Sequence, residues 1–158
     1  MIMDYAISLT EVESSYLAAV RATVTRRTLS VTIRQILGAN KIYPFIKSAG
    51  LQKAGHNVIV YENDRSRSFG NEFEIEVGVQ VAAPFEGNDE VICSSTPAGR
   101  AATTLHTGPY DRLGQAHDAI MTWAKKEGIA LTGRSWEVYG DWHEDPNQLT
   151  TEVLYLLK

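Results

Sequence analysis

The chain has 158 residues, with 15 Lys and Arg, 19 Asp and Glu, a net charge of -4 and a pI of about 5.5. A chain of this length forms one compact domain or two small fused repeats, which excludes a large multidomain enzyme. Its acidity gives no attraction for a phosphate backbone, so direct DNA binding is not expected. Residues 1–83 carry 9 basic and 8 acidic groups, whereas residues 84–158 carry 6 and 11, so a cationic ligand would prefer the second half.

The sequence offers little support for metal or cofactor chemistry. Cys93 is the only cysteine, which excludes an internal disulfide and a multi-cysteine metal site and suits a reducing compartment. The four histidines, His56, His106, His117 and His143, do not have metal-ligand spacing. Nucleotide-binding and serine-hydrolase motifs are absent from the sequence, and so is an apolar run of the ~20 residues that span a bilayer. We therefore expect a cytoplasmic protein that binds neither cofactor nor membrane.

The first half of the chain has the pattern strand, helix, strand, strand. Apolar residues recur at helical spacing after Ser30 or Thr32, either of which can cap the helix, until Gly50 ends it. Pro44 lies inside this helix and lacks the N–H that would bond to the carbonyl of Asn40, which predicts a bend. The surrounding strands are expected over residues 4–25, 57–61 and 72–79.

The second half repeats this order. Tyr110 precedes a helix with an apolar stripe at helical spacing, and Gly128 ends that helix. A polar loop over residues 140–148, with Asp145-Pro146 inside it, separates the last two strands. Strands are expected over residues 91–94, 100–106, 135–139 and 150–157.

The repeat is also visible as identities. When the sequence is shifted by 78 positions, nine residues match over residues 25–74, where ordinary composition gives roughly three. We therefore predict a single α+β domain over residues 1–158, with one β-α-β-β repeat over about 1–83 and a second over about 84–158. The two pseudo-symmetric repeats are expected to form one antiparallel sheet with two helices on one side. The alternative explanation is that the identities arise only because the two halves have similar secondary structure.

The alternation of apolar residues assigns side chains to the two faces of this sheet. The apolar residues of the strand over residues 72–79 must pack under the helices, so its glutamates point away from the helices. Glu152 occupies an equivalent position in the second repeat, at the 78-residue offset, and is therefore also expected to point away from the helices. The same reasoning, applied to the shorter strands, assigns Tyr61, Glu137 and Tyr139 to the side of Glu152. We therefore expect Tyr139 and Glu152 to share a cleft between the two halves.

On its own face of the strand, Glu152 has only Leu154 and Leu156 as neighbours. A buried carboxylate needs a donor, a proton or a cation, and a hydrogen-bonded glutamate at a strand end is the simpler alternative. Aromatic rings can add to the attraction for a cation, although charge outweighs any one ring. The candidate ligand-binding residues are Glu152, Tyr139, Tyr110, Glu137, Leu154, Tyr61, Trp142 and Trp123.

Several segments together resemble the GyrI-like effector-binding domain, which is also attached to AraC-type and MerR-type regulators. They are the stretch from His106 through Gly-Pro-Tyr110, the Trp-Glu-Val-Tyr139 strand, the Asp-Pro loop and the Thr-Glu-Val-Leu-Tyr155 strand, with residues 54–61 as the counterpart in the first half. The resemblance covers nearly the whole chain. It implies a SOUL-like fold with a cleft for bulky aromatic, often cationic compounds.

The same resemblance assigns roles to individual residues. Glu152 matches the glutamate that faces the positive charge of the ligand, and Tyr139 and Tyr110 match two cleft tyrosines. Because the chain starts directly in this domain, without room for a helix-turn-helix, we do not expect a complete one-component transcription factor. A monomer or weak dimer that binds a small hydrophobic or cationic ligand is expected.

These residues are compatible with three functions. The first is a stand-alone module that binds bulky cationic or amphipathic drugs or metabolites, with no catalytic residue. The second is a hydrolase of cyclopropane-bearing genotoxic compounds that uses Glu152 and Tyr139, an activity that some family members have. The third is a protein-interaction module such as a gyrase modulator, for which the acidic residues Asp141, Glu144 and Asp145 are the only hint.

Overall fold

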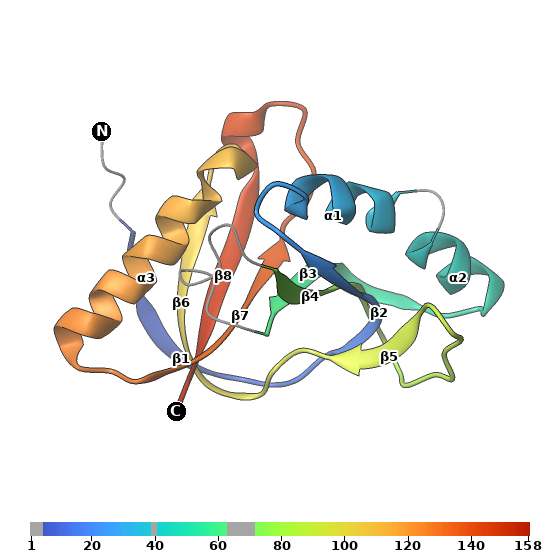
Figure 1. Ribbon diagram of the computed structural model, residues 1–158, viewed down its shortest axis with the longest axis horizontal. Coiled ribbons are helices and arrows are strands. Elements are labelled where there is room, and N and C mark those ends of the chain that lie inside the picture. Colours follow the sequence, from blue (N-terminus) through green and yellow to red (C-terminus); the bar gives the residue numbers. More distant parts are fainter. Residues whose placement is uncertain (1–4, 39–40, 63–71) are drawn as a thin grey trace.

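A single antiparallel sheet organises the chain, and helices cover one of its faces (Figure 1). The computed structural model describes residues 5–38, 41–62 and 72–158. The helices are α1 (Leu29–Leu37), α2 (Ile42–Ser48) and α3 (Leu113–Glu127), with short 3-10 helices η2 (Tyr110–Arg112) and η3 (Pro146–Gln148). The strands are β1 (Ser8–Val12), β2 (Tyr16–Val24), β3 (Lys53–Tyr61), β4 (Phe73–Val81), β5 (Ile92–Ser95), β6 (Gly99–Thr107), β7 (Leu131–Tyr139) and β8 (Thr150–Leu157).

The strand order is symmetric about the centre of the sheet. The eight strands follow the order β1-β6-β8-β7-β3-β4-β2-β5 within the described part of the chain. Strands β3 and β7 pair at the centre, with Val58 opposite Val138 and Val60 opposite Trp136. Outward from this pair, β4 and β2 lie on one side and β8 and β6 on the other, so each half of the chain contributes one β-α-β-β unit. The predicted pseudo-symmetric α+β fold is confirmed.

The helical segment of the first half is divided, which the sequence did not predict. One helix to Gly50 was expected, but α1 ends at Leu37 and α2 begins at Ile42. The predicted bend at Pro44 is wrong, because this residue lies in the first turn of α2, where its missing N–H has no partner within the helix. The carbonyl of Asn40 lies outside the described residues. The expected strand over residues 4–25 likewise forms two strands, β1 and β2.

Helix α3 covers the half of the sheet that contains β6 and β8 (Figure 1). Its buried stripe of Leu113, Ala116 and Ile120 packs with Val153 and Tyr155. It ends as predicted at Gly128, whose φ of 69° is the left-handed conformation that favours glycine at this position. Helices α1 and α2 cover the other half of the sheet in the same way. The helix-covered cores of the two halves therefore meet over β3 and β7.

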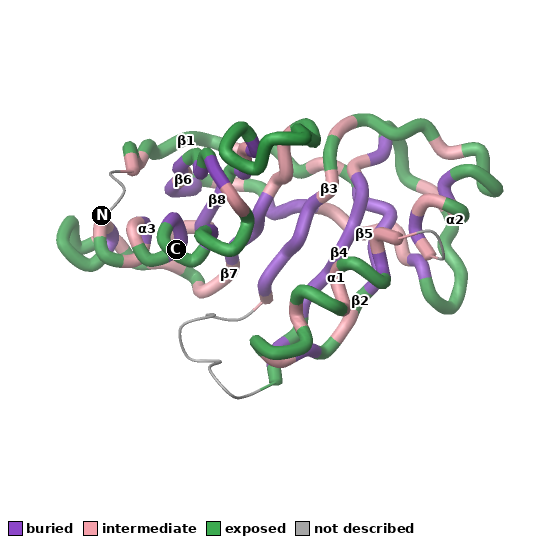
Figure 2. Tube along the Cα trace, turned by 90° about the horizontal axis from the view of Figure 1, so that it is seen from above, coloured by how far each residue is buried: buried purple, intermediate pink, exposed green. Residues whose placement is uncertain are grey.

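The opposite face of the sheet carries a second core. Leu17, Val58 and Val60 are completely buried, and Trp136 is 3% exposed, in one cluster that includes Leu154. No helix of the described chain packs against this cluster, so the sheet itself must curve around it. Each of the two central strands has a buried section, at the end of β3 and in the middle of β7 (Figure 2). The second core explains why alternation alone gave the wrong face for β3 and β7: both faces of these strands contain buried residues, and the apolar set of β7 faces away from the helices.

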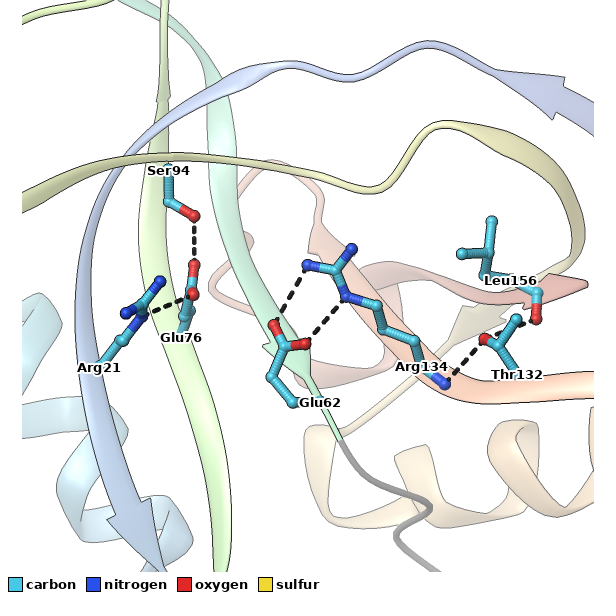
Figure 3. Close-up of polar contacts among 7 residues, drawn as sticks. All are labelled: Arg21, Glu62, Glu76, Ser94, Thr132, Arg134 and Leu156. Atoms are coloured by element: carbon cyan, nitrogen blue, oxygen red, sulfur yellow. Dashed lines mark hydrogen bonds and ion pairs between the residues drawn. The ribbon is translucent and has the colours of Figure 1, made fainter.

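Two ion pairs lie on this second face, at the edge of a polar hollow of about 510 Å³ (Figure 3). The Arg134 guanidinium binds both carboxylate oxygens of Glu62, at 3.0 and 3.2 Å, and so links β7 to the end of β3. Arg21 binds Glu76 at 3.0 Å, and the hydroxyl of Ser94 donates to the same carboxylate. Glu76 therefore points away from the helices, on the face predicted for it. In the described ranges, no helix is both long and apolar enough to cross a membrane.

Candidate functional site

A cavity of about 1060 Å³ opens over the central strands, between α1 and the start of α3. Helix α1 supplies an apolar wall through Leu29, Ile33 and Leu37. The floor comes from β3 and β7, which lie side by side at the centre of the sheet. The cavity therefore lies where the two halves of the chain meet. The described lining also includes the aromatic residues Tyr43, Tyr61, Tyr110, Tyr139 and Trp142.

Glu137 is the acidic residue at the floor of the cavity. Its side chain is 2% exposed and lines the cavity from β7. The hydroxyls of Tyr139 and Tyr61 both donate to its Oε1, at 2.9 and 3.2 Å. One tyrosine comes from each half of the chain, at positions related by the 78-residue offset. Two tyrosine hydroxyls thus hold the Glu137 carboxyl group beside a large hollow, where a carboxylate can pair with a positively charged group.

The other oxygen of Glu137 contacts a buried histidine. His117 Nε2 lies 2.6 Å from Glu137 Oε2, and His117 Nδ1 lies 2.7 Å from the Tyr155 hydroxyl. In the tautomer with its proton on Nε2, His117 donates to Glu137 and accepts from Tyr155. The three residues come from α3, β7 and β8, so this chain of hydrogen bonds fixes the glutamate against the helix. Every polar atom in it has a partner, as a buried network requires.

Tyr139 stays protonated far beyond neutral pH. Burial of its hydroxyl, followed by the charge of Glu137, raises the pKa of Tyr139 well above 10. It therefore remains a hydrogen-bond donor to Glu137. Burial also raises the pKa of Tyr110, whose ring lies 5.1 Å from that of Tyr139 at an angle of 57°. The two rings form one aromatic surface beside the carboxylate, and aromatic faces attract cations.

The loop after β7 forms the mouth of the cavity. Trp142 lines the cavity and is 76% exposed, so its ring is available to a ligand. Its neighbour Asp141 contacts His56 of β3 at 2.9 Å, which holds the loop against the other half of the chain. Asp145 caps η3 by accepting from the backbone of Asn147. Two of the three acidic loop residues considered for a protein partner thus have contacts within the chain.

The structure brings together five of the eight candidate ligand-binding residues and leaves three elsewhere. Leu154 is 3% exposed in the second core, on the other face of the sheet. Trp123 is half-buried and packs against the core under α3. Glu152 is exposed and does not line the cavity. The five that line it are Tyr61, Tyr110, Glu137, Tyr139 and Trp142.

The prediction that Tyr139 and Glu152 share the cleft is wrong. In the pairing of β7 with β8, Glu152 lies opposite Val138, whereas Tyr139 lies opposite Thr151. Paired residues point to the same face, so Glu152 and Tyr139 point to opposite faces. Glu152 instead accepts a hydrogen bond from Thr103 at 3.2 Å near the exposed end of its strand. It is the hydrogen-bonded glutamate that the sequence left as the alternative.

Sequence reasoning missed His117 and the wall formed by α1. His117 lies on the apolar stripe of its helix, four residues after Leu113 and three before Ile120, and this spacing could have marked it as a buried polar group. The apolar wall was hidden because α1 was taken as part of one longer helix. No cluster of three or more metal-ligating side chains occurs in the part of the chain that the structure describes. Cys93 is a free, half-buried cysteine in β5.

The family comparison decides what kind of domain this is. The model of the GyrI-like small molecule binding domain matches residues 7–158. The chain belongs to this family. The resemblance seen in the sequence is therefore confirmed, and this GyrI-like domain occupies almost the whole chain. None of the curated proteins matches it.

Solved structures share the fold of this GyrI-like domain at low sequence identity. The EcmrR C-terminal domain is 23% identical, with a TM-score of 0.79 over 99% of both chains. In an EcmrR–DNA complex, the domain matches only 57% of the EcmrR chain, at 22% identity and a TM-score of 0.81. SAV2435 bound to tetraphenylphosphonium is 12% identical, with a TM-score of 0.69 over 99% of this chain and 94% of that one. A hydrolase from Listeria innocua is 9% identical, with a TM-score of 0.59 over 96% and 91%.

Proposed function

We propose that this GyrI-like domain binds bulky, amphipathic compounds that carry a positive charge, and that Glu137 selects for that charge. The observation that carries the proposal is the Glu137 carboxylate, which is 2% exposed at the floor of a cavity of about 1060 Å³. Glu137 takes the role that the sequence had suggested for Glu152. The negative charge remains inside the domain, but it comes from the central strand β7 rather than from β8.

Electrostatics favours a cation at this site. A carboxylate buried from water has little solvent screening, so its field reaches farther into the cavity than that of an exposed acid. Two unit charges 4 Å apart attract each other by about 4 kcal/mol at an effective dielectric of 20, whereas one aromatic face adds about 0.5–2 kcal/mol. Charge on Glu137 therefore dominates selectivity, while Tyr110 and Tyr139 supply contact area.

The size and composition of the cavity favour a multi-ring ligand. Ligand cavities in proteins commonly measure about 300–1000 Å³, and this one lies just above that range. One wall is the apolar side of α1 and the other is aromatic, so a flat or propeller-shaped aromatic compound can be covered on both sides. A neighbour in fold, SAV2435, was solved with tetraphenylphosphonium, a cation of this type. The family description as a small-molecule-binding domain also supports the proposal.

Calorimetric titration with tetraphenylphosphonium tests the role of Glu137. In Glu137→Gln the shape is kept and the charge is removed, so we expect the dissociation constant for this cation to rise about tenfold or more. The affinity for triphenylphosphine oxide, a neutral compound with similar rings, should fall by less than about threefold, because its binding does not depend on the charge. An equal loss for both compounds would reject a charge-selective Glu137.

Glu152→Gln is the matched control for this titration. It removes the same charge from an exposed position on the other face of the sheet. Because an exposed charge is strongly screened, we expect its effect on tetraphenylphosphonium binding to stay within about twofold. If Glu152→Gln weakened the binding of the cation as much as Glu137→Gln does, the assignment of the selective charge to the floor of the cavity would be wrong.

Hydrolysis is a second candidate function, and the contact between Glu137 and His117 favours it. A glutamate held by a histidine, with the Tyr139 hydroxyl 2.9 Å away, could activate a water molecule against a strained ring or ester bound in the cavity. A fold neighbour from Listeria innocua is described as a hydrolase. Mass spectrometry of a cyclopropane-bearing compound after long incubation distinguishes the two functions. Product that the wild type forms and Glu137→Gln does not form would support hydrolysis, whereas recovery of the intact compound from the wild type would support binding alone.

A further inference from the structure

The lining of the cavity carries charges of both signs. The second half of the chain contributes the acidic residues Asp111, Glu137 and Asp141, of which Asp141 contacts His56. The first half contributes Arg34 from α1 and Lys53 from β3. All acidic residues of the described lining come from the second repeat, whose part of the lining is called the acidic side, and the basic ones come from the first repeat, the basic side. A ligand with one positive charge would use only half of this arrangement.

Arg34 is available to an anion. Its side chain is exposed and forms two long hydrogen bonds of 3.5 Å to Ser30, one turn earlier in the same helix. It forms no ion pair with an acidic residue in the described ranges. A guanidinium with weak local contacts can turn toward a ligand without breaking a strong bond.

Lys53 is the second free cation of this wall. Its Nζ lies 5.7 Å from the centre of the Tyr43 ring, and Tyr43 is held in turn by a 2.5 Å hydrogen bond to Asn57. The exposed lysine has no acidic partner among the residues the structure describes. The aromatic ring keeps the ammonium beside the cavity, because a ring face attracts a cation.

We propose that the preferred ligands are amphoteric aromatic compounds, with a cationic group toward Glu137 and a carboxylate toward Arg34 and Lys53. This inference rests on the proposed function and narrows its ligand class. A guanidinium matches a planar carboxylate through two parallel N–H donors, and an ammonium adds a compact charge. Both basic side chains are exposed, so the carboxylate keeps part of its hydration and the cost of removing it from water stays small.

The acidic side also fixes the direction of the ligand. Asp111 lines the cavity from η2, on the same side as Glu137 and Tyr110. A carboxylate placed there would face like charges, which disfavour that orientation. The compound therefore has one preferred orientation, set by attraction at one end and repulsion at the other.

Two commercial dyes that differ by one methyl group provide the test. Rhodamine 110 carries a free carboxylate on its cationic ring system, whereas rhodamine 123 is its methyl ester and carries only the positive charge. Fluorescence anisotropy at pH 7.5 gives the dissociation constant of each dye. We expect the wild-type domain to bind rhodamine 110 about 3- to 10-fold more tightly than rhodamine 123, as two partly solvated ion pairs would give.

The double variant Arg34→Gln/Lys53→Gln locates the effect. It should bind rhodamine 123 as the wild type does, since that dye has no carboxylate, and the preference for rhodamine 110 should disappear. Unchanged binding of rhodamine 123 also shows that the variant is folded. Arg34→Lys/Lys53→Arg keeps both charges and should retain a preference of about 2-fold or more. Lys47→Gln, on α2 and outside the described cavity lining, should retain the full preference.

Each outcome has a distinct meaning. Binding of rhodamine 123 without a preference for rhodamine 110 would overturn this inference and leave the proposed function in place. A preference that persists in Arg34→Gln/Lys53→Gln would overturn the assignment of the carboxylate to these two residues. If neither dye bound, the proposed cation binding would fail, and this inference would fail with it.

Discussion

His117 Nε2 lies 2.6 Å from Glu137 Oε2, and both side chains are 2% exposed. This contact joins α3 to the central strand β7 directly beneath the cavity. Since the same glutamate also accepts hydrogen bonds from two tyrosines, the charge proposed to select the ligand is part of the folded core. Function and stability are therefore linked at this residue, and variants of its partners can measure that link.

Replacement of His117 should be strongly destabilising. In His117→Leu the volume is approximately kept, but Glu137 and the Tyr155 hydroxyl both lose a partner. Loss of a hydrogen-bond partner costs a buried polar group about 1–3 kcal/mol, and a charged group more, so with two groups affected we expect the free energy of unfolding to fall by about 3 kcal/mol or more. Urea denaturation measures it. His143→Leu, in the exposed loop, should stay within about 0.5 kcal/mol. A loss below about 1 kcal/mol in His117→Leu would contradict the conclusion that the contact between His117 and Glu137 stabilises the fold.

Tyr139 should make stability depend on alkaline pH. Burial and the charge of Glu137 raise the pKa of Tyr139 well above 10, whereas the unfolded chain releases this proton near pH 10. The folded state thus binds more protons at alkaline pH. The stabilisation is complete below about pH 10 and is lost as pH rises through the folded-state pKa, by up to about 1.4 kcal/mol per pH unit.

The variant Tyr139→Phe isolates this contribution. Its free energy of unfolding should decline less steeply than that of the wild type between about pH 9.5 and 11, as measured by urea denaturation across that range. Tyr16→Phe is the control, because Tyr16 is 45% exposed in β2, and its profile should follow the wild type. Identical slopes for Tyr139→Phe and the wild type would show that Tyr139 titrates normally in the folded state.

The sequence predicted the architecture because its signals were local and repeated. Helical spacing after Tyr110, the stop at Gly128 and the 78-residue offset each specify structure without knowledge of distant contacts. The break before α2 was missed because Tyr43 and Ile46 continue the spacing of Ile33, Ile36 and Leu37 closely enough to suggest one helix. Apolar spacing alone cannot reveal where one helix ends and another begins.

The candidate site was harder to predict, because it depends on which face of each central strand carries the helices. In β7, Trp136 and Val138 alternate with Glu137 and Tyr139, and both sets are at least partly buried. Alternation separates the two faces but does not say which one the helices cover. The natural choice of the apolar set for the helix side is wrong here, since a second core takes Trp136. The acid of the cavity is consequently Glu137 and not Glu152.

The second core should be as important to stability as the helix-covered one. Leu17 is completely buried on the face of the sheet that lacks helices, and Leu105 is 58% exposed on that same face. Leu17→Ala leaves a cavity among packed side chains, so we expect a loss of about 2–5 kcal/mol in the free energy of unfolding. The same substitution at Leu105 removes little buried area and should cost less than about 0.5 kcal/mol.

Chemical denaturation of the two leucine variants measures both losses with identical chemistry. The comparison tests the curvature of the sheet, because a flat sheet would leave this face open to water and Leu17 would then behave like Leu105. Similar small losses at both positions would contradict a buried second core. A large loss at Leu17 alone would support the reason given for the reversed faces of β3 and β7, since only a buried second face allows Val58, Val60 and Trp136 to point away from the helices.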